Sequence, residues 1–226
     1  MDIQSLPGKT QDYLKTVWFI TERSGEAASL SAIAQDMGQK ASTASEAMKR
    51  LVDRGLVHHE RYLGVTLTPE GQRLALAMVR RHRLVEMFLC ETLGYTWDEV
   101  HDEAEVLEHA ITDTLLDRID EHLGHPTRDP HGDPIPAADG TMDDVGTEDL
   151  STVAVGETAI IDRILDRDAD LLRYLAAHGV TPGAQITVTD APYPGMRVVQ
   201  AEGFDPAPIA DAALEAINIR ATTPQG

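Results

Sequence analysis

The chain has 226 residues, of which 42% are hydrophobic, and its formal net charge is −19. This length and hydrophobic content are sufficient for two or three small domains with ordinary cores. No apolar run approaches a membrane-spanning length, and the N-terminal residues lack the hydrophobic region of a signal peptide. The one cysteine, Cys90, excludes an internal disulfide framework, so we expect a cytoplasmic protein with no membrane partner.

The acidic charge is unevenly distributed. Residues 1–75 hold nine Lys/Arg and nine Asp/Glu, whereas residues 76–226 hold ten Lys/Arg and twenty-nine Asp/Glu. The whole excess therefore lies in the last two thirds of the chain. The first third carries no net charge that would repel the phosphates of a nucleic acid.

The first third of the chain predicts two helices joined by a short turn. The first helix runs from Ser31, as its N-cap, to Gly38. The second is opened by Thr43 and Glu46, which have the spacing of a capping box, and ends at Gly55.

A hairpin follows, with strands predicted around residues 56–57 and 65–67. Thr68 and Pro69 then begin the next helix, with the proline at its first position. Helix, turn, helix and β-wing is the order of a winged helix-turn-helix domain, which we place at residues 1–75.

In a winged helix-turn-helix domain the second helix enters the major groove of DNA, led by its N-terminal residues. On this helix the candidate contacts to double-stranded DNA are Ser42, Thr43, Ser45, Glu46, Lys49 and Arg50. Arg61, at the wing tip, is placed for backbone or minor-groove contact. The alternative is a protein-interaction module, since winged folds also serve that purpose and a net charge of zero is unusual for a DNA-binding domain.

Potential metal ligands recur on a helix that begins with a second capping box, Thr96 and Glu99. The ligands are His101, Glu105, Glu108 and His109. Their spacing of i, i+4, i+7 and i+8 predicts a single helical face. Upstream, His82 and Glu86 form a further i, i+4 pair.

Carboxylates with imidazoles and no thiolate favour a divalent ion such as Mn²⁺ or Fe²⁺. The alternative is an acidic, solvated helix with scattered histidines. A neighbouring apolar face of the same helix predicts a homodimer interface; it consists of Val100, Ala104, Leu107, Ile111 and Leu115.

The last third predicts a small β domain. Residues 137–149 lack apolar periodicity and predict a linker, which we place at residues 141–150. Strands are predicted near 153–161, 186–188 and 217–219, with a short helix over 168–178. The predicted fold is mainly α with small β parts: the winged helix-turn-helix domain, a helical domain over 76–140, and a β-barrel over 151–226.

From about Thr10 to the C-terminus, the sequence resembles the diphtheria toxin repressor family of metal-activated transcriptional repressors. The most specific stretches are residues 81–86, 100–104, 107–109 and 131–136. The resemblance implies a winged helix that binds operator DNA, a helical domain that binds metal and dimerises, and an SH3-like (FeoA-type) β-barrel.

The resemblance also implies two metal sites. The primary ligands would be Asp12, Glu105, Glu108 and His109. The ligands of the second site would be His82, Glu86, His101, Asp129, His131 and Asp166. Lys15 departs from the glutamate of the two-domain manganese regulators, which favours the three-domain arrangement. Arg163 departs from an ancillary glutamate of the iron-dependent relatives.

Two positions separate the branches of the family. Iron-responding members have a methionine at the position of Asp12 and a cysteine at that of Glu105, whereas manganese-responding members have carboxylates, as this chain does. The resemblance therefore implies a manganese-activated repressor of manganese uptake genes and not an enzyme. Co²⁺, Ni²⁺ or Zn²⁺ would also bind in vitro. The alternatives are an iron-dependent repressor, a metal-dependent hydrolase and a metal-storage or scaffold protein.

Overall fold

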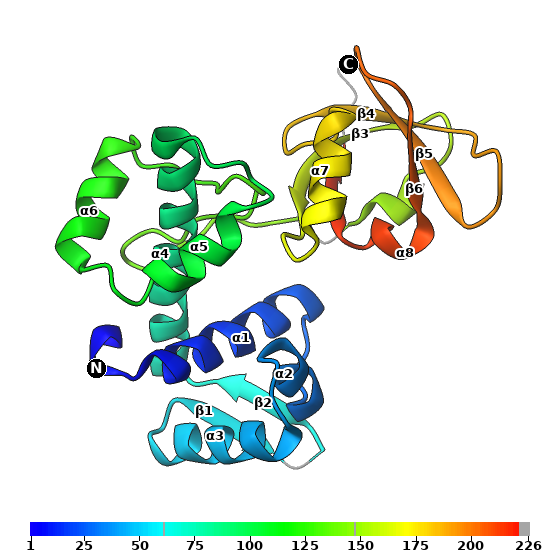
Figure 1. The fold of residues 1–226 in the computed structure, drawn as a ribbon. Coiled ribbons are helices and arrows are strands. Elements are labelled where there is room, and N and C mark those ends of the chain that lie inside the picture. Colours follow the sequence, from blue (N-terminus) through cyan, green and yellow to red (C-terminus); the bar gives the residue numbers. More distant parts are fainter. Residues whose placement is uncertain (61, 147, 222–226) are drawn as a thin grey trace. The chain divides into compact units, whose positions relative to one another are not determined.

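Two compact units make up the chain in the computed structural model, which describes residues 1–60, 62–146 and 148–221. The first unit comprises Met1–His82, Leu107–Thr112 and Pro136–Met142, and the second comprises the rest. The long helix α4, Pro69–Leu93, belongs partly to each (Figure 1). Within the described residues, no helix combines the length and the apolar character needed to cross a membrane.

The first unit contains the winged helix. Its elements are η1 (Ile3–Ser5), α1 (Gly8–Ser24), α2 (Leu30–Asp36), α3 (Ala41–Asp53), β1 (Val57–Glu60), β2 (Gly64–Leu67) and the start of α4. The strands pair antiparallel, with Val57 opposite Leu67. Leu14, Ile33 and Met48 are fully buried and join the first three helices in one apolar core. The predicted order of helix, turn, helix and wing is confirmed.

The helix starts differ from two of the three predictions in this unit. The N-cap of α2 is Ser29, whose hydroxyl accepts from the backbone N–H of Ala32, and not Ser31. Helix α3 begins two residues before Thr43, so the predicted capping box with Glu46 is wrong. The third prediction holds, because the Thr68 hydroxyl accepts from the N–H of Gly71 at the start of α4.

The predicted ligand-bearing helix is broken. Helix α5 covers Val100–Leu107 and helix α6 covers Asp113–His122. Glu108 and His109 lie in the turn after α5, where the N–H groups of Ala110 and Ile111 both donate to the carbonyl of Leu107. The prediction of one helical face for all four ligands is therefore wrong. Glu108 is buried against charged partners, and such tertiary contacts override the helical periodicity of the sequence.

The apolar seam that predicted the dimer interface is partly used within the chain. Val100, Ala104 and Ile111 are buried. Leu107 and Leu115 stay 38% and 50% exposed. Only these two residues of the five are available to a partner.

The second unit ends in a five-stranded antiparallel sheet of order β6-β5-β4-β3-β7. The strands are β3 (Thr158–Ile164), β4 (Gln185–Thr189), β5 (Met196–Ala201), β6 (Ala207–Ala210) and β7 (Ile217–Ala221). The short helices are η2 (Leu150–Thr152), α7 (Ala169–Ala177) and α8 (Asp211–Leu214). Ile161, Leu172, Val188 and Ile217 are fully or almost fully buried in its core. The predicted small β domain with one amphipathic helix is confirmed.

A tight loop, residues 128–135, is attached to strand β3. The N–H of Ile164 donates to the carbonyl of His131 at 2.9 Å. Gly132 has φ +89°, and a Cβ on it would lie 2.2 Å from the carbonyl oxygen of Asp162. Glycine is thus required twice over, for its backbone angle and for its close approach to the strand.

Replacing Gly132 with alanine is expected to destabilise the second unit by about 2–4 kcal/mol, from a left-handed backbone angle and a steric clash together. Gly140→Ala is the matched control. Gly140 has φ +86°, but its Cβ would meet only Leu76 Cδ1 at 3.7 Å, an ordinary contact. Its expected loss is about 1 kcal/mol. The free energy of unfolding is measured from denaturation curves. An equal loss in both variants would contradict the close packing at Gly132.

Candidate metal centres and DNA-binding face

Helix α1 and the turn after α5 bring three predicted ligands of the primary site together in the first unit. Nε2 of His109 lies 2.9 Å from Oδ1 of Asp12 and 3.6 Å from Oε1 of Glu108. One ligand atom from each residue lies within 4.8 Å of the others, a spacing that a metal ion could bridge. The donors are two carboxylates and one imidazole, a set that suits divalent cations of the first transition row.

Glu108 is the buried anchor of this group. Its Oε1 and Oε2 lie 2.7 and 2.8 Å from Nζ of Lys15, and Oε2 lies 2.8 Å from Nδ1 of His82. Burial alone would raise the pKa of the Glu108 carboxyl, but its contacts with His82 and Lys15 hold that pKa below its ordinary value. Glu108 therefore stays ionised although it is buried.

His109 meets a hydrogen-bond acceptor at each ring nitrogen. Its Nδ1 lies 2.7 Å from Oε1 of Gln11, and its Nε2 faces the carboxylate of Asp12. A neutral imidazole carries one N–H, so it can donate to only one of these oxygens. A divalent cation at Nε2 would be shared with the carboxylate oxygens of Asp12 and Glu108. The residues of this site thus fit the divalent metal that the sequence predicts.

Glu105 was predicted as the fourth primary ligand. It lies on α5 in the second unit, where its Oε1 is 3.8 Å from Nε2 of His101. His82, predicted for the second site, contacts Glu108 in the first unit. The roles of both residues as metal ligands stay predictions.

A second group of ligands forms within the second unit. Nδ1 of His101 lies 3.0 Å from Oδ2 of Asp166 and 3.4 Å from Oε1 of Glu86. Burial lowers the pKa of His101, but hydrogen bonds to Asp166 and Glu86 more than offset it and raise the pKa to about 11. This position thus favours a positive charge, and a metal ion bound there would have to displace a proton.

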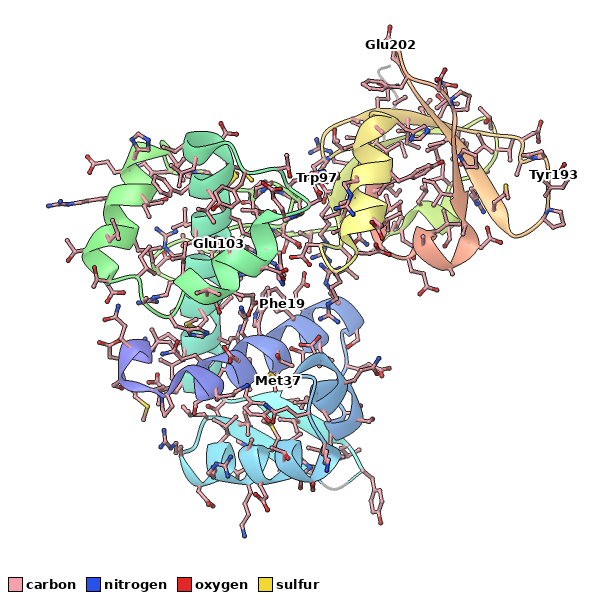
Figure 2. All side chains as sticks on the ribbon, in the orientation of Figure 1. Phe19, Met37, Trp97, Glu103, Tyr193 and Glu202 are labelled. Carbon is pink, nitrogen blue, oxygen red and sulfur yellow. The ribbon has the colours of Figure 1, made fainter. Side chains whose placement is uncertain are left out.

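The loop after α6 adds two predicted residues to this group. One ligand atom from each of Glu86, Asp129 and His131 lies within 4.8 Å of the others, and all three residues are buried. Nε2 of His131 contacts the carbonyl of Trp97 at 2.7 Å, while Nδ1 lies 3.8 Å from Oε2 of Glu86. A metal-binding histidine commonly donates its other N–H to a backbone carbonyl in this way. Trp97, labelled in Figure 2, also stacks on the imidazole of His131.

Asp129 has a structural task in addition to its predicted one. Its Oδ1 accepts from the N–H groups of His131 and Asp133, both at 2.9 Å, and so shapes the loop. Burial and the neighbouring Asp133 and Glu86 raise the pKa of Asp129 to about 7. Arg83, fully buried, lies 3.4 Å from Oδ2 of Asp129.

Several residues of these centres were not predicted from the sequence. Gln11 and Trp97 orient histidines, and no ligand motif marks them. Arg83 and Arg163 both pair with Asp133, at 3.4 and 3.0 Å, and hold the loop to β3. The ion pair with Asp133 gives Arg163 a structural role.

The predicted DNA-binding residues lie on helix α3. Ser42, Thr43, Glu46, Lys49 and Arg50 are exposed, and Ser45 is half-buried. Arg61 lies outside the described residues. Helix α3 begins at Ala41, so its first turn contains Ser42 and Thr43. This is the part of a recognition helix that is expected to contact bases.

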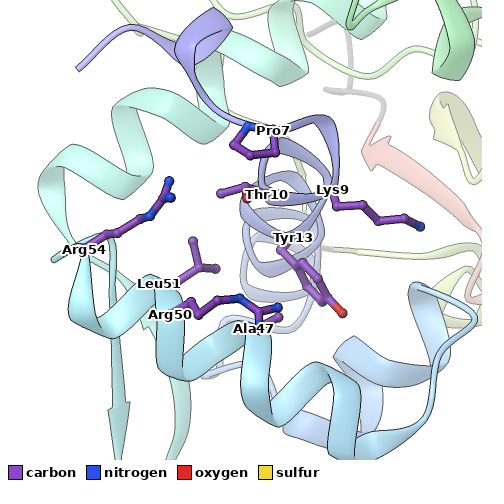
Figure 3. Close-up of a pocket in the computed structure, with 8 residues that line it drawn as sticks. All are labelled: Pro7, Lys9, Thr10, Tyr13, Ala47, Arg50, Leu51 and Arg54. Carbon is purple, nitrogen blue, oxygen red and sulfur yellow. The ribbon is translucent and has the colours of Figure 1, made fainter.

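A cavity of about 310 Å³ lies between α1 and α3. It is lined by Pro7, Lys9, Thr10, Tyr13, Ala47, Arg50, Leu51 and Arg54, which are drawn in Figure 3. Three of these residues, Lys9, Arg50 and Arg54, are cations.

Models of known protein families cover most of the chain. Residues 5–65 match the iron-dependent repressor N-terminal DNA-binding domain, and residues 68–137 match the metal-binding and dimerisation domain of the same repressors. Residues 149–221 match the FeoA domain.

Curated proteins and solved structures agree with these matches. The iron-dependent repressor IdeR of Mycobacterium bovis is 32% identical over 209 residues, which are 87% of this chain and 90% of that protein. The diphtheria toxin repressor of Corynebacterium diphtheriae is 33% identical, over 71% of this chain and 68% of that protein.

Among solved structures, a manganese-dependent transcriptional repressor in complex with manganese is 45% identical, with a TM-score of 0.88. It covers 94% of this chain, which in turn covers 100% of that one. The manganese regulator SloR is 32% identical, with a TM-score of 0.77, over 94% of this chain and 98% of that one. The chain therefore belongs to the iron-dependent (diphtheria toxin) repressor family, whose members are metal-dependent transcriptional repressors and not enzymes.

Proposed function

We propose that this member of the family is activated by Mn²⁺ and represses genes for manganese uptake. The observation that carries the proposal is the convergence of Asp12 on Glu108 and His109. Asp12 supplies an oxygen, a hard donor, where the resemblance assigns sulfur to the iron-responding branch. The manganese complex among the similar structures supports this choice. Iron-dependent activation is the second candidate, because IdeR and the diphtheria toxin repressors also match.

The proposed mechanism couples the metal site to the DNA-binding region through α1. Asp12 belongs to α1, which packs in the winged-helix core, whereas Glu108 and His109 belong to the segment matched as the metal-binding and dimerisation domain. A bound divalent cation supplies the positive charge that allows these acceptors to converge. Asp12 then holds α1 to the dimerisation segment, and the spacing of the two α3 helices of a dimer is fixed. Metal binding and operator binding become linked equilibria.

Glu105 is proposed as the fourth ligand of the primary site. It is half-buried and ionisable, and it lies one turn before Glu108 and His109 along the chain. With Asp12 it would make the site rich in oxygen, which suits Mn²⁺ better than a sulfur-containing site does.

The second site is proposed to restrain the β domain. Glu86 and His101 come from α4 and α5, His131 and Asp129 from the loop, and Asp166 from the segment after β3. A metal ion held by these residues would join the helical part of the second unit to its sheet. The contacts of His101 with Glu86 and Asp166 already link the same segments.

The proposed assembly is a homodimer on a palindromic operator. Leu107 and Leu115, exposed beside the metal-binding segment, are the residues proposed to contact the partner. The residues proposed to contact the operator are those of α3 named above, with Arg61. The proposed domains are residues 1–75, 76–140 and 151–226. A linker at residues 141–150 joins the second domain to the third.

DNA binding is tested with Arg50→Ala. Arg50 is exposed and lines the cationic cavity, so its loss should weaken binding to all sequences and reduce the salt slope by about one. Arg118→Ala, which removes an exposed cation from α6, is the control and should change neither quantity. Gel shifts over a salt series with Mn²⁺ give both numbers. An unchanged slope for Arg50→Ala would show that this face does not meet phosphate.

Metal identity is tested with the double variant Asp12→Met and Glu105→Cys. Exchanging oxygen donors for sulfur should shift repression of a reporter gene toward Fe²⁺, Co²⁺ or Ni²⁺ and weaken the response to Mn²⁺. Reporter activity is measured in cells grown with each metal. If the unmodified protein represses with iron and ignores manganese, the iron-dependent candidate is correct.

The second site is tested with Asp166→Ala. Because Asp166 contacts His101 beside Glu86, its loss should remove about one metal ion per chain and leave the fold intact. Asp170→Ala removes an exposed carboxylate from the first turn of α7 and is the control. Metal content after dialysis against Mn²⁺ is the measurement. Equal content in both variants and the unmodified protein would exclude Asp166 as a ligand.

A further inference from the structure

Gln11 is a buried side chain beside the primary ligands that has no assigned role in metal binding. It is 5% exposed, directly precedes Asp12 on α1, and makes three hydrogen-bond contacts. Its Nε2 contacts the carbonyl oxygens of Ile3 and Leu6, each at 2.9 Å. Its Oε1 contacts Nδ1 of His109 at 2.7 Å.

These contacts leave one orientation for the Gln11 amide. The carbonyls of Ile3 and Leu6 only accept hydrogen bonds, so the two N–H bonds of the Gln11 amide must point at them. The opposite orientation would place the amide oxygen against two carbonyl oxygens. The oxygen Oε1 therefore faces His109, and it can only accept.

The orientation of the amide determines where the proton of His109 resides. An acceptor at Nδ1 requires an N–H there, and in a neutral imidazole this leaves Nε2 with its lone pair. Nε2 is the atom that lies 2.9 Å from Asp12 and 3.6 Å from Glu108. A neutral ring oriented in this way can therefore bind a cation through Nε2, together with these carboxylates.

We propose that Gln11 is a positioning residue of the primary metal site: it holds the proton of His109 on Nδ1, so that Nε2 binds the divalent cation. This inference rests on the proposed function. Without the acceptor, a neutral His109 can place its N–H on Nε2 and donate it to Asp12. That hydrogen bond would block both ligand atoms, and a cation would have to displace it. Partners that orient a metal-binding histidine typically contribute about 10- to 100-fold in affinity.

Two variants of Gln11 separate positioning from support of the N-terminal turn. Gln11→Leu removes the acceptor and both donors, whereas Gln11→Glu removes the donors and keeps an acceptor for Nδ1–H. Both should melt at a lower temperature, since both leave the carbonyls of Ile3 and Leu6 unpaired. The control is Gln4→Leu. Gln4 donates to the carbonyl of Ile111 in the same unit.

The first measurement needs no metal. In the full-length protein labelled with ¹⁵N-histidine, at about pH 8 where an ordinary imidazole is neutral, Nδ1 of His109 should have the shift of a protonated nitrogen. The same should hold in Gln11→Glu and Gln4→Leu. In Gln11→Leu the proton should move toward Nε2. A bare Nδ1 in the unmodified protein would overturn the inference.

The second measurement is Mn²⁺ affinity, from the free-ion signal in electron paramagnetic resonance. Gln11→Leu should bind about 10- to 100-fold more weakly, whereas Gln11→Glu and Gln4→Leu should bind at least nearly as tightly as the unmodified protein. Equal losses in both Gln11 variants would mean that the residue only supports the turn, and no loss in either would also overturn the inference. If the unmodified protein binds no Mn²⁺ while its Nδ1 is protonated, the proposed function fails and the proton placement stands.

Discussion

The need for a positive charge among clustered carboxylates, buried or half-buried, governs both candidate metal centres. Glu108 is held ionised by Lys15 and His82, and Asp12 approaches Nε2 of His109 to 2.9 Å. In a protein interior such negative groups separate or become protonated unless a cation lies between them. Lys15 supplies such a charge to Glu108. A divalent cation bound among Asp12, Glu108 and His109 would supply a further positive charge and would tie Asp12, and with it α1, to the turn after α5.

In the first centre Lys15 supplies a positive charge, whereas in the second centre a proton on His101 supplies it. Its carboxylates, Glu86 and Asp166, face His101, whose pKa they raise to about 11 against the opposing effect of burial. A metal ion bound there would have to displace that proton, so its binding would be coupled to pH as well as to folding. Buried Arg83 and Arg163 pair with Asp129 and Asp133 and attach the loop, which carries two of the proposed ligands, to its surroundings.

Much of the fold could be predicted from the sequence, because it depends on local patterns. The wing, the start of α4 at Thr68 and the final β domain follow from alternation, turns and caps. The break after Leu107 could not be predicted, because Glu108 leaves the helix for partners 93 and 26 residues away, Lys15 and His82. Six candidate ligands were predicted from their spacing, whereas Asp12, Asp129, His131 and Asp166 were predicted through the resemblance to a family. Residues that orient these ligands, such as Gln11, act through the direction of their hydrogen bonds. The spacing of residues in the sequence does not reveal that direction.

The central claim is that one cation joins Asp12 to Glu108 and His109. Its most direct test is anomalous diffraction at the manganese absorption edge, from crystals of the full chain grown with Mn²⁺. The account predicts an anomalous peak bounded by Asp12, Glu108 and Nε2 of His109, with Nδ1 of that ring still on Gln11. A well-ordered crystal whose manganese peaks all lie elsewhere, with His109 hydrogen-bonded directly to Asp12, would contradict it.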